Sequence, residues 1–156
     1  MIRLAGLKTL ALILGLVPGT VMASDILTIS GNEASESYSF EDLAALPQEK
    51  VLTDNFYVDE VTEFSGPLLR DLLDPFGVTR DDTLKMTAVN DFSVEIPVDD
   101  ILDYDVILAL RRNGETMSIR GKGPIWVIYP MDDHPELVAP QYNDRLIWQL
   151  TGIKIE

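Results

Sequence analysis

The cysteine and histidine content of this 156-residue chain limits which kinds of catalysis and metal binding it could carry out. The chain has no cysteine and one histidine, His134. A thiol nucleophile, a thiolate metal ligand and a disulfide are therefore excluded, and one histidine leaves little for transition-metal ligation or for a histidine-based catalytic triad. Ser65 and Ser118 lack the sequence context of a nucleophile elbow. Local chemistry alone identifies no catalyst.

Carboxylates are the most abundant reactive groups, and the formal net charge of the chain is -14. Acidic pairs occur at 81–82, 99–100 and 132–133. A calcium loop needs several converging oxygens around a sharp glycine turn, and none of these runs has that spacing. We expect solvated acidic faces and no metal site. A surface of this charge repels nucleic acid and anionic lipid, so no nucleic-acid partner is predicted.

The stretch "GKGPIWVIYP", residues 121–130, combines a glycine-rich loop with an apolar strand that contains a tryptophan. Alternation places Trp126 and Ile128 on one face of the strand. The other face carries Ile125, Val127 and Tyr129. Both faces are apolar, which predicts an interior strand. Trp126 then has two interpretations: a packed core residue, or a stacking wall for a planar ligand beside glycines that let the backbone approach it.

Arg111 and Arg112 end an apolar strand predicted over 106–110. Adjacent strand residues point to opposite faces, so the two side chains cannot share one solvent side while the strand continues. One guanidinium is then expected to face a pocket or a buried carboxylate, a role that suits its planar, bidentate fork. The alternative is a frayed strand end with both guanidinium groups in water.

The elements that must position these residues are short strands and a few helices. Two hairpins are predicted, one turning at Asn90-Asp91 and one at Asn113-Gly114. A capping box at Ser39 and Asp42 predicts the start of a helix over 39–47. Further helices are predicted over 66–78 and 97–104, an irregular to helical segment over 132–150, and extended segments over 25–30, 50–66, 84–89, 92–97, 105–119, 124–130 and 152–155. This pattern predicts a single α+β domain with a mixed or antiparallel sheet.

Residues 1–23 have the features of a signal peptide. Arg3 and Lys8 form a positive start, "TLALILGLVPGTV" is a short apolar run, and the small residues Val21 and Ala23 precede a cleavage point before Ser24. The apolar run is short and broken for a membrane span. We expect an exported mature domain of residues 24–156 that is periplasmic and has no membrane insertion after cleavage; the alternative is an uncleaved N-terminal anchor.

Five stretches, taken in order between Val51 and Ile155, together resemble the sulfite-oxidase-like molybdopterin-binding domain family. "FSGPLLRDLLDPFGV" is similar to the family's "GVPLRDLL…GV" helix, and "AVNDFSVEIP" is similar to its "A-x-D-G-Y-x…IP" hairpin. "DVILALRRNGETM" resembles "ILAYxxNGExL", "GKGPIWVIYP" resembles "GGPLRLVxP", and "YNDRLIWQLTGIKI" resembles the closing "W-V-x-x-I-x-V" segment. The resemblance implies one α+β domain with a mixed sheet and a pterin pocket.

Two departures from the family pattern shape the functional expectation. The family's enzymes bind molybdenum through a cysteine on the strand before the "GVPL" helix, where this chain has "KVLTDNFYV" and no cysteine. The family's arginine on the "PLRLVxP" strand corresponds to Trp126. An inherited pocket without the thiolate and with an added ring is suited to bind a planar heterocycle and not to transfer electrons.

The resemblance therefore implies a non-catalytic periplasmic protein with a pterin as ligand and no molybdenum. Small cysteine-less members of this kind act with membrane signalling proteins that control cyclic-dinucleotide levels, which implies the periplasmic domain of a membrane sensor as partner. The ligand-binding residues expected from it are Trp126 as stacking wall, Arg111, Asn90 and Asp91 at the ring edges, and Tyr129 and Asn55 as lining.

Two other hypotheses stay open at this point. The chain could be a molybdopterin-dependent oxidoreductase with another metal ligand, or a degenerate relative of one. It could also be a structural partner with a filled pocket, whose negative charge suits docking to a basic surface.

Overall fold

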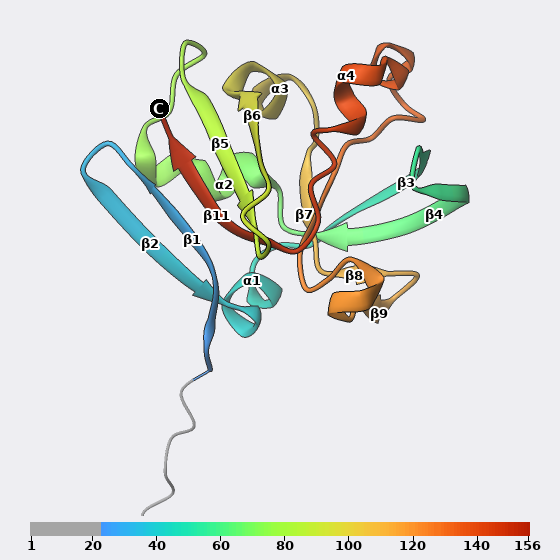
Figure 1. The fold of residues 1–156 in the computed structure, drawn as a ribbon, viewed down its shortest axis with the longest axis horizontal. Coiled ribbons are helices and arrows are strands. Elements are labelled where there is room, and N and C mark those ends of the chain that lie inside the picture. The colour runs from blue at the N-terminus through green and yellow to red at the C-terminus, as the bar shows by residue number, and fades with distance from the viewer. Residues whose placement is uncertain (1–22) are drawn as a thin grey trace, which may run out of the picture.

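The structure, a computed structural model, describes residues 23–156. In this part of the chain strands outnumber helices and form three sheets. The largest sheet has the order β2-β1-β11-β5-β6 (Figure 1). β1 pairs with β11 in parallel, whereas the other neighbours in this sheet are antiparallel. Its strands are β1 (Asp25–Gly31), β2 (Ala34–Ser39), β5 (Thr83–Ala88), β6 (Ser93–Pro97) and β11 (Leu150–Ile155). The predicted α+β class with a mixed sheet is confirmed.

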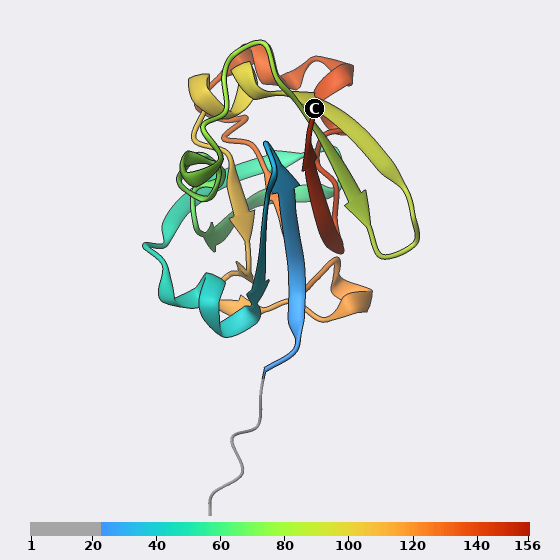
Figure 2. The ribbon, with the colours of Figure 1, turned by 90° about the vertical axis from the view of Figure 1, so that its left-hand side faces the viewer.

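The two smaller sheets lie beside the large one. The second has the order β3-β4-β8-β9, and its long β3–β4 hairpin extends away from the five-stranded sheet (Figure 1). The third contains only β7 and β10. These strands are β3 (Glu49–Asn55), β4 (Val58–Gly66), β7 (Ile107–Ala109), β8 (Arg111–Arg112), β9 (Glu115–Thr116) and β10 (Trp126–Ile128). Seen from the β1–β2 side, the large sheet lies in front of the two small ones (Figure 2).

The helices are short and connect the sheets. They are α1 (Phe40–Ala45), α2 (Leu69–Leu73), α3 (Val98–Asp103) and α4 (Pro140–Asn143). The predicted capping box is present: the Asp42 amide donates to Ser39 Oγ over 3.1 Å, and the Ser39 amide donates to Asp42 Oδ2 over 2.9 Å. The Ser39 hydroxyl also donates to this carboxylate, and these bonds lower the pKa of Asp42. α2 is shorter than predicted, because Pro75 turns the chain into a 3-10 turn over Asp74–Phe76.

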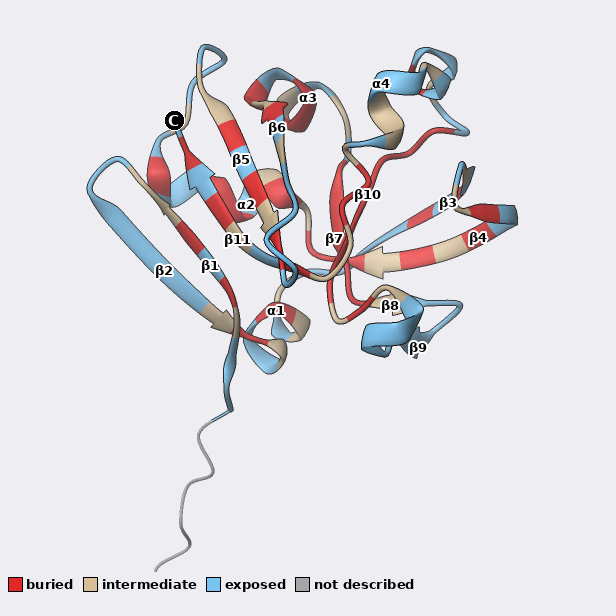
Figure 3. Cartoon of the chain, in the orientation of Figure 1, coloured by how far each residue is buried: buried red, intermediate tan, exposed pale blue. Residues whose placement is uncertain are grey.

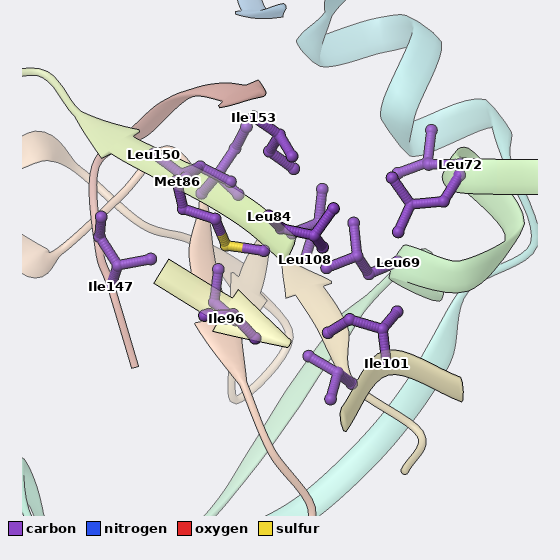
Figure 4. Packing of buried hydrophobic residues seen from close by; sticks show 14 of the residues in the cluster. Leu69, Leu72, Leu84, Met86, Ile96, Ile101, Leu108, Ile147, Leu150 and Ile153 are labelled. Atoms are coloured by element: carbon purple, nitrogen blue, oxygen red, sulfur yellow. The ribbon is translucent and has the colours of Figure 1, made fainter. Parts of the chain in front are cut away.

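β7 and β10 separate two hydrophobic cores. Val127 of β10 and Leu108 of β7 face a large, mostly aliphatic core built on the five-stranded sheet. In that core the side chains of β5, β6, β7, β11, α2 and α3 point toward one another (Figure 4). Trp126 and Ile107 face the opposite way, into a smaller core under the β3–β4 hairpin. Both strands are fully buried, as predicted for a strand that is apolar on both faces (Figure 3).

β4 runs directly against β7, and Gly66 makes this approach possible. A Cβ atom at Gly66 would lie 1.9 Å from the Leu108 carbonyl oxygen, so no larger residue fits without moving the backbone. Next to it the Leu110 amide donates to the Ser65 carbonyl and the Leu108 amide donates to the Pro67 carbonyl, over 2.8 Å and 3.0 Å. The end of β4 is thus joined to the central strand of both cores.

Two parts of the predicted element pattern differ from the structure. β2 was not expected, because "ASESYS" has no apolar alternation; it is an exposed edge strand that pairs only with β1 (Figure 3). The strands of the hairpin at Asn113-Gly114 are shorter than predicted. Only the two-residue strands β8 and β9 pair across it, since β7 pairs with β10 instead.

Residues 1–22 of the predicted signal peptide lie outside the described residues, and its predicted cleavage stays a prediction. No helix within residues 23–156 is both long and apolar enough to cross a membrane.

Candidate functional site

A cavity of about 340 Å³ lies between the tip of the β3–β4 hairpin, the β5–β6 turn and the segment that leads into β11. Its volume is in the range of pockets that hold small ligands. The lining residues are aromatic, aliphatic and amide side chains with one carboxylate: Tyr57, Ala88, Asn90, Phe92, Asn143, Asp144, Leu146, Ile147 and Trp148.

Two rings from distant parts of the chain form the aromatic wall of this cavity. Tyr57 lies at the tip of the hairpin and Trp148 lies just before β11, with ring centroids 4.9 Å apart and ring planes at 77°. The Tyr57 hydroxyl donates to the Asn143 carbonyl over 3.3 Å, which ties the hairpin tip to the end of α4. Burial, with the Asp144 carboxylate as a second cause, raises the pKa of Tyr57. Both effects favour the neutral phenol, which is the form that donates this hydrogen bond.

The polar lining comes from two turns. Asn90, in the β5–β6 turn, accepts a hydrogen bond from the Phe92 amide at its side-chain oxygen over 3.2 Å. That bond orients the side chain and leaves the amide NH₂ group available to a ligand. Asn143 and Asp144 contribute an amide and a carboxylate from the opposite side. The site thus combines flat apolar faces with a few donors and acceptors, which suits a flat heterocycle with polar edges.

Trp126 does not form the accessible wall that one interpretation expected. Its side chain has no exposed surface, and it is absent from the cavity lining. Its indole N–H donates to the Leu146 carbonyl over 2.9 Å, which satisfies its one polar atom inside the core. The core interpretation is therefore the correct one, because β10 is covered on both faces. Trp126 instead lies behind Trp148, with ring centroids 6.4 Å apart and planes at 87°.

Tyr129 is also a core residue and not cavity lining. Its hydroxyl donates to Asp100 Oδ2 over 2.9 Å, and the same carboxylate pairs with Arg145. Burial, followed by the negative charge of Asp100, raises the pKa of Tyr129 well above its ordinary value. This network joins α3 to the segment that carries Asp144 and Trp148, so Tyr129 supports the site from beneath.

The other predicted residues fall at different distances from the cavity. Of the expected contacts only Asn90 lines it; Asp91 is its neighbour in the same turn, with a left-handed φ of 65°. Asn55 lies at the hairpin tip, where its side-chain oxygen accepts from the Tyr57 amide over 2.9 Å. Its Nδ2 is buried without a hydrogen-bond partner among residues 23–156. Arg111 does not line the cavity, because β8 pairs with β4 at Phe64 and Ser65, at the opposite end of the hairpin from its tip. Arg111 forms no ion pair with a carboxylate of residues 23–156.

Apart from Asn90, sequence reasoning missed all the lining residues: the aromatic and polar ones, Tyr57, Phe92, Asn143, Asp144 and Trp148, and the aliphatic ones, Ala88, Leu146 and Ile147. Trp148 was visible as the second tryptophan of the chain, within the closing segment "YNDRLIWQL". Its position opposite Trp126 depends on a backbone bridge between the two residues, which local sequence does not encode.

The fold is an α+β domain with a cavity of a size typical of small-ligand pockets. Residues 16–132 match the family model described as oxidoreductase molybdopterin binding domain. The match covers most of the chain, and the chain belongs to this family. No curated protein matches it.

The residues present fit only part of a molybdopterin-type cofactor. The aromatic wall and the amides suit the pterin ring. The molybdenum end is not accommodated, because the chain has no cysteine for a thiolate bond. Within residues 23–156 no cluster of three histidine, aspartate or glutamate side chains offers another metal site.

Proposed function

We propose that this protein binds a pterin in the cavity beside Trp148 and does so without catalysing a reaction. The observation that carries the proposal is the pairing of Trp148 and Tyr57 at an open cavity in a family whose members bind a molybdopterin-type cofactor. A pterin is flat and has donors and acceptors along its edges. Trp148 and Tyr57 offer ring faces, and Asn90, Asn143 and Asp144 offer groups that can pair with such edges.

The absence of cysteine from the sequence supports binding over redox catalysis. A pterin can be held by stacking and hydrogen bonds alone, whereas the family's metal chemistry uses a thiolate that this chain does not possess. The proposed role is therefore to report whether a pterin is present.

The proposed partner that detects the pterin-bound form is the periplasmic domain of a membrane sensor that controls cyclic-dinucleotide levels. The N-terminal sequence supports export to the periplasm. The β3–β4 hairpin offers a surface for a partner, because Leu52, Phe56 and Val61 are more than half exposed on it. Phe56 is in edge-to-face contact with Tyr57, 5.2 Å between centroids, so this surface adjoins the cavity wall.

The experiment is a titration of the purified protein with tetrahydrobiopterin, followed by tryptophan fluorescence. Trp148→Ala is expected to weaken binding by about 1–3 kcal/mol, because it removes the partly exposed stacking face. Trp126→Phe is the matched control: it leaves Trp148 as the only tryptophan and should retain quenching by the ligand. Absence of binding by the wild-type protein at high pterin concentration would refute the proposal.

An oxidoreductase function remains the second candidate, because the matched family is described by that activity. It requires molybdenum bound through a group other than cysteine. Metal analysis of the protein purified from its own source tests it, and stoichiometric molybdenum would favour this candidate over the binding function.

A further inference from the structure

Lys122 lies inside a cage of three aromatic rings. Its Nζ is 4.9 Å from the ring centroid of Trp148, 5.4 Å from that of Trp126 and 5.8 Å from that of Tyr57. These distances are those of cation–π contacts, in which the negative face of a ring attracts an ammonium. No ion pair joins Lys122 to a carboxylate of residues 23–156, although acidic residues greatly outnumber basic ones. The rings are the partners of this charge.

The Gly-Lys-Gly loop holds the lysine in this place by its backbone. Lys122 has a left-handed φ of 73°, its amide donates to the Ile119 carbonyl, and its carbonyl accepts from the Gln149 amide. Gln149 makes a second bond to this loop, from its side-chain Nε2 to the Ile119 carbonyl over 2.7 Å. A Cβ atom at Gly123 would lie 1.9 Å from the Met117 carbonyl oxygen, so the turn closes only with glycine.

The loop is therefore bonded to the residue next to Trp148, and its charge lies against the ring of Trp148. Trp148 and Tyr57 are only partly buried, and both line the cavity. Trp126 supports Trp148 from behind, and the Tyr57 hydroxyl is held by the Asn143 carbonyl. The Lys122 ammonium, which lies over all three rings, adds a restraint that acts on Trp148 and Tyr57 together.

We propose that Lys122 is a positioning residue for the pterin cavity: its ammonium fixes the angle between Trp148 and Tyr57 and so determines how tightly a planar ligand stacks. The proposal rests on the proposed function for its ligand, but the restraint on the rings exists without a ligand. Lys122 is not part of the cavity lining, and its effect on binding passes through the two rings.

The test compares Lys122→Met, which keeps an unbranched chain but loses the charge, with Lys122→Arg, which keeps it. Lys85→Met, on an exposed position of β5, is the matched control. Lys122→Met should lower tetrahydrobiopterin affinity about 3- to 30-fold, the range of a partly buried cation–π contact. Lys122→Arg should retain most of the affinity, and Lys85→Met should bind as the wild type does.

Two measurements without pterin keep the inference separate from the proposed function. Lys122→Met should change the near-ultraviolet circular dichroism of the tryptophans and increase quenching of Trp148 by acrylamide in a Trp126→Phe background. Methylammonium added to Lys122→Ala should enter the vacated cage and restore both signals. It should restore neither signal if Lys122 acts only through the packing of its aliphatic chain.

The outcomes separate cleanly. If the wild type fails to bind the pterin but the two ligand-free signals depend on Lys122, the proposed function fails and the restraint stands. If the wild type binds and Lys122→Met matches it in affinity and in both signals, the inference is wrong. If Lys122→Met is unfolded, rescue by Lys122→Arg or by methylammonium supports the inference, and failure of both contradicts it.

Discussion

The two cores on either side of the β7–β10 sheet are built from different side chains and have different exposure. The large core consists mainly of aliphatic residues that close on themselves, such as Leu84, Ile96 and Leu108 (Figure 4). The small core contains Phe64 and Trp126, and its ring contacts continue outward to the partly exposed Trp148. The cavity lies where the two cores meet: the large core contributes the aliphatic residues Ala88, Leu146 and Ile147 to its lining, and Trp148, packed against the small core, contributes an aromatic ring.

One strand thus contributes both to the large core and to the cavity wall. Alternate residues of β10 enter opposite cores, so Val127 adds to the general hydrophobic stabilisation while Trp126 supports the cavity-lining ring of Trp148. Trp126, which has no exposed surface, thus touches the cavity lining only indirectly, through its contact with Trp148 and its hydrogen bond to the Leu146 carbonyl.

The largest effect that would test the comparison comes from truncating one residue on each side. Trp126→Ala and Leu108→Ala should each lower the free energy of unfolding, by about 3–5 kcal/mol and about 2–5 kcal/mol, because both side chains are fully buried. Urea denaturation measures this loss. Only Trp126→Ala should also weaken pterin binding. Equal affinities in the two variants would mean that the cores are not functionally distinct.

A smaller effect concerns the Tyr129 network that joins the large core to the cavity segment. Because the folded-state pKa of Tyr129 is raised, the native state binds its proton more tightly than the unfolded chain does. The contribution is fully present below pH 10 and is lost as pH rises further. Burial and Glu136 raise the pKa of Tyr104 to about 12, so Tyr104 acts in the same direction between about pH 10 and about pH 12.

We therefore expect the free energy of unfolding to fall between about pH 10 and about pH 12, and Tyr129→Phe to reduce that slope. At neutral pH the same variant should cost about 1–3 kcal/mol, because the Asp100 carboxylate loses a donor. Urea unfolding across this pH range is the measurement. A slope that the variant leaves unchanged would assign the alkaline loss to other groups.

The smallest effect is expected at the surface of the β3–β4 hairpin. Lys50 and Glu63 form an ion pair across its strands at 3.1 Å, with the lysine side chain 68% exposed. Lys50→Met should change the free energy of unfolding by no more than about 0.5 kcal/mol, since solvent screens such pairs. A loss above about 1 kcal/mol in urea denaturation would show that surface charge, and not the aromatic core, holds the hairpin in place.

Much of the fold followed from local patterns in the sequence. The Ser39–Asp42 capping box, the hairpin at Asn90-Asp91 and a buried strand within 124–130 are each encoded by a few neighbouring residues, and each is present, although the strand covers only Trp126–Ile128. The edge strand β2 escaped prediction, because both of its faces are polar and its pairing comes only from β1.

The site was harder to predict because its parts meet only in three dimensions. Asn90 was expected and lines the cavity, but the stacking role was assigned to Trp126 when Trp148 is the ring that reaches the cavity. The two tryptophans are bridged across strands that are far apart in sequence. Alternation along β10 shows that Trp126 has a defined face; it does not show that another tryptophan covers it.

The absence of a side chain at Gly66 restricts which substitutions the protein tolerates at this position. A single methyl group there would force β4 off the backbone of β7, and the hairpin that carries Tyr57 would move with it. The displacement at the hairpin tip would be large, because Tyr57 lies nine residues from Gly66 along the strand. A larger residue at Gly66 is therefore expected to weaken the junction of β4 with β7 and to displace Tyr57 from the cavity wall at the same time.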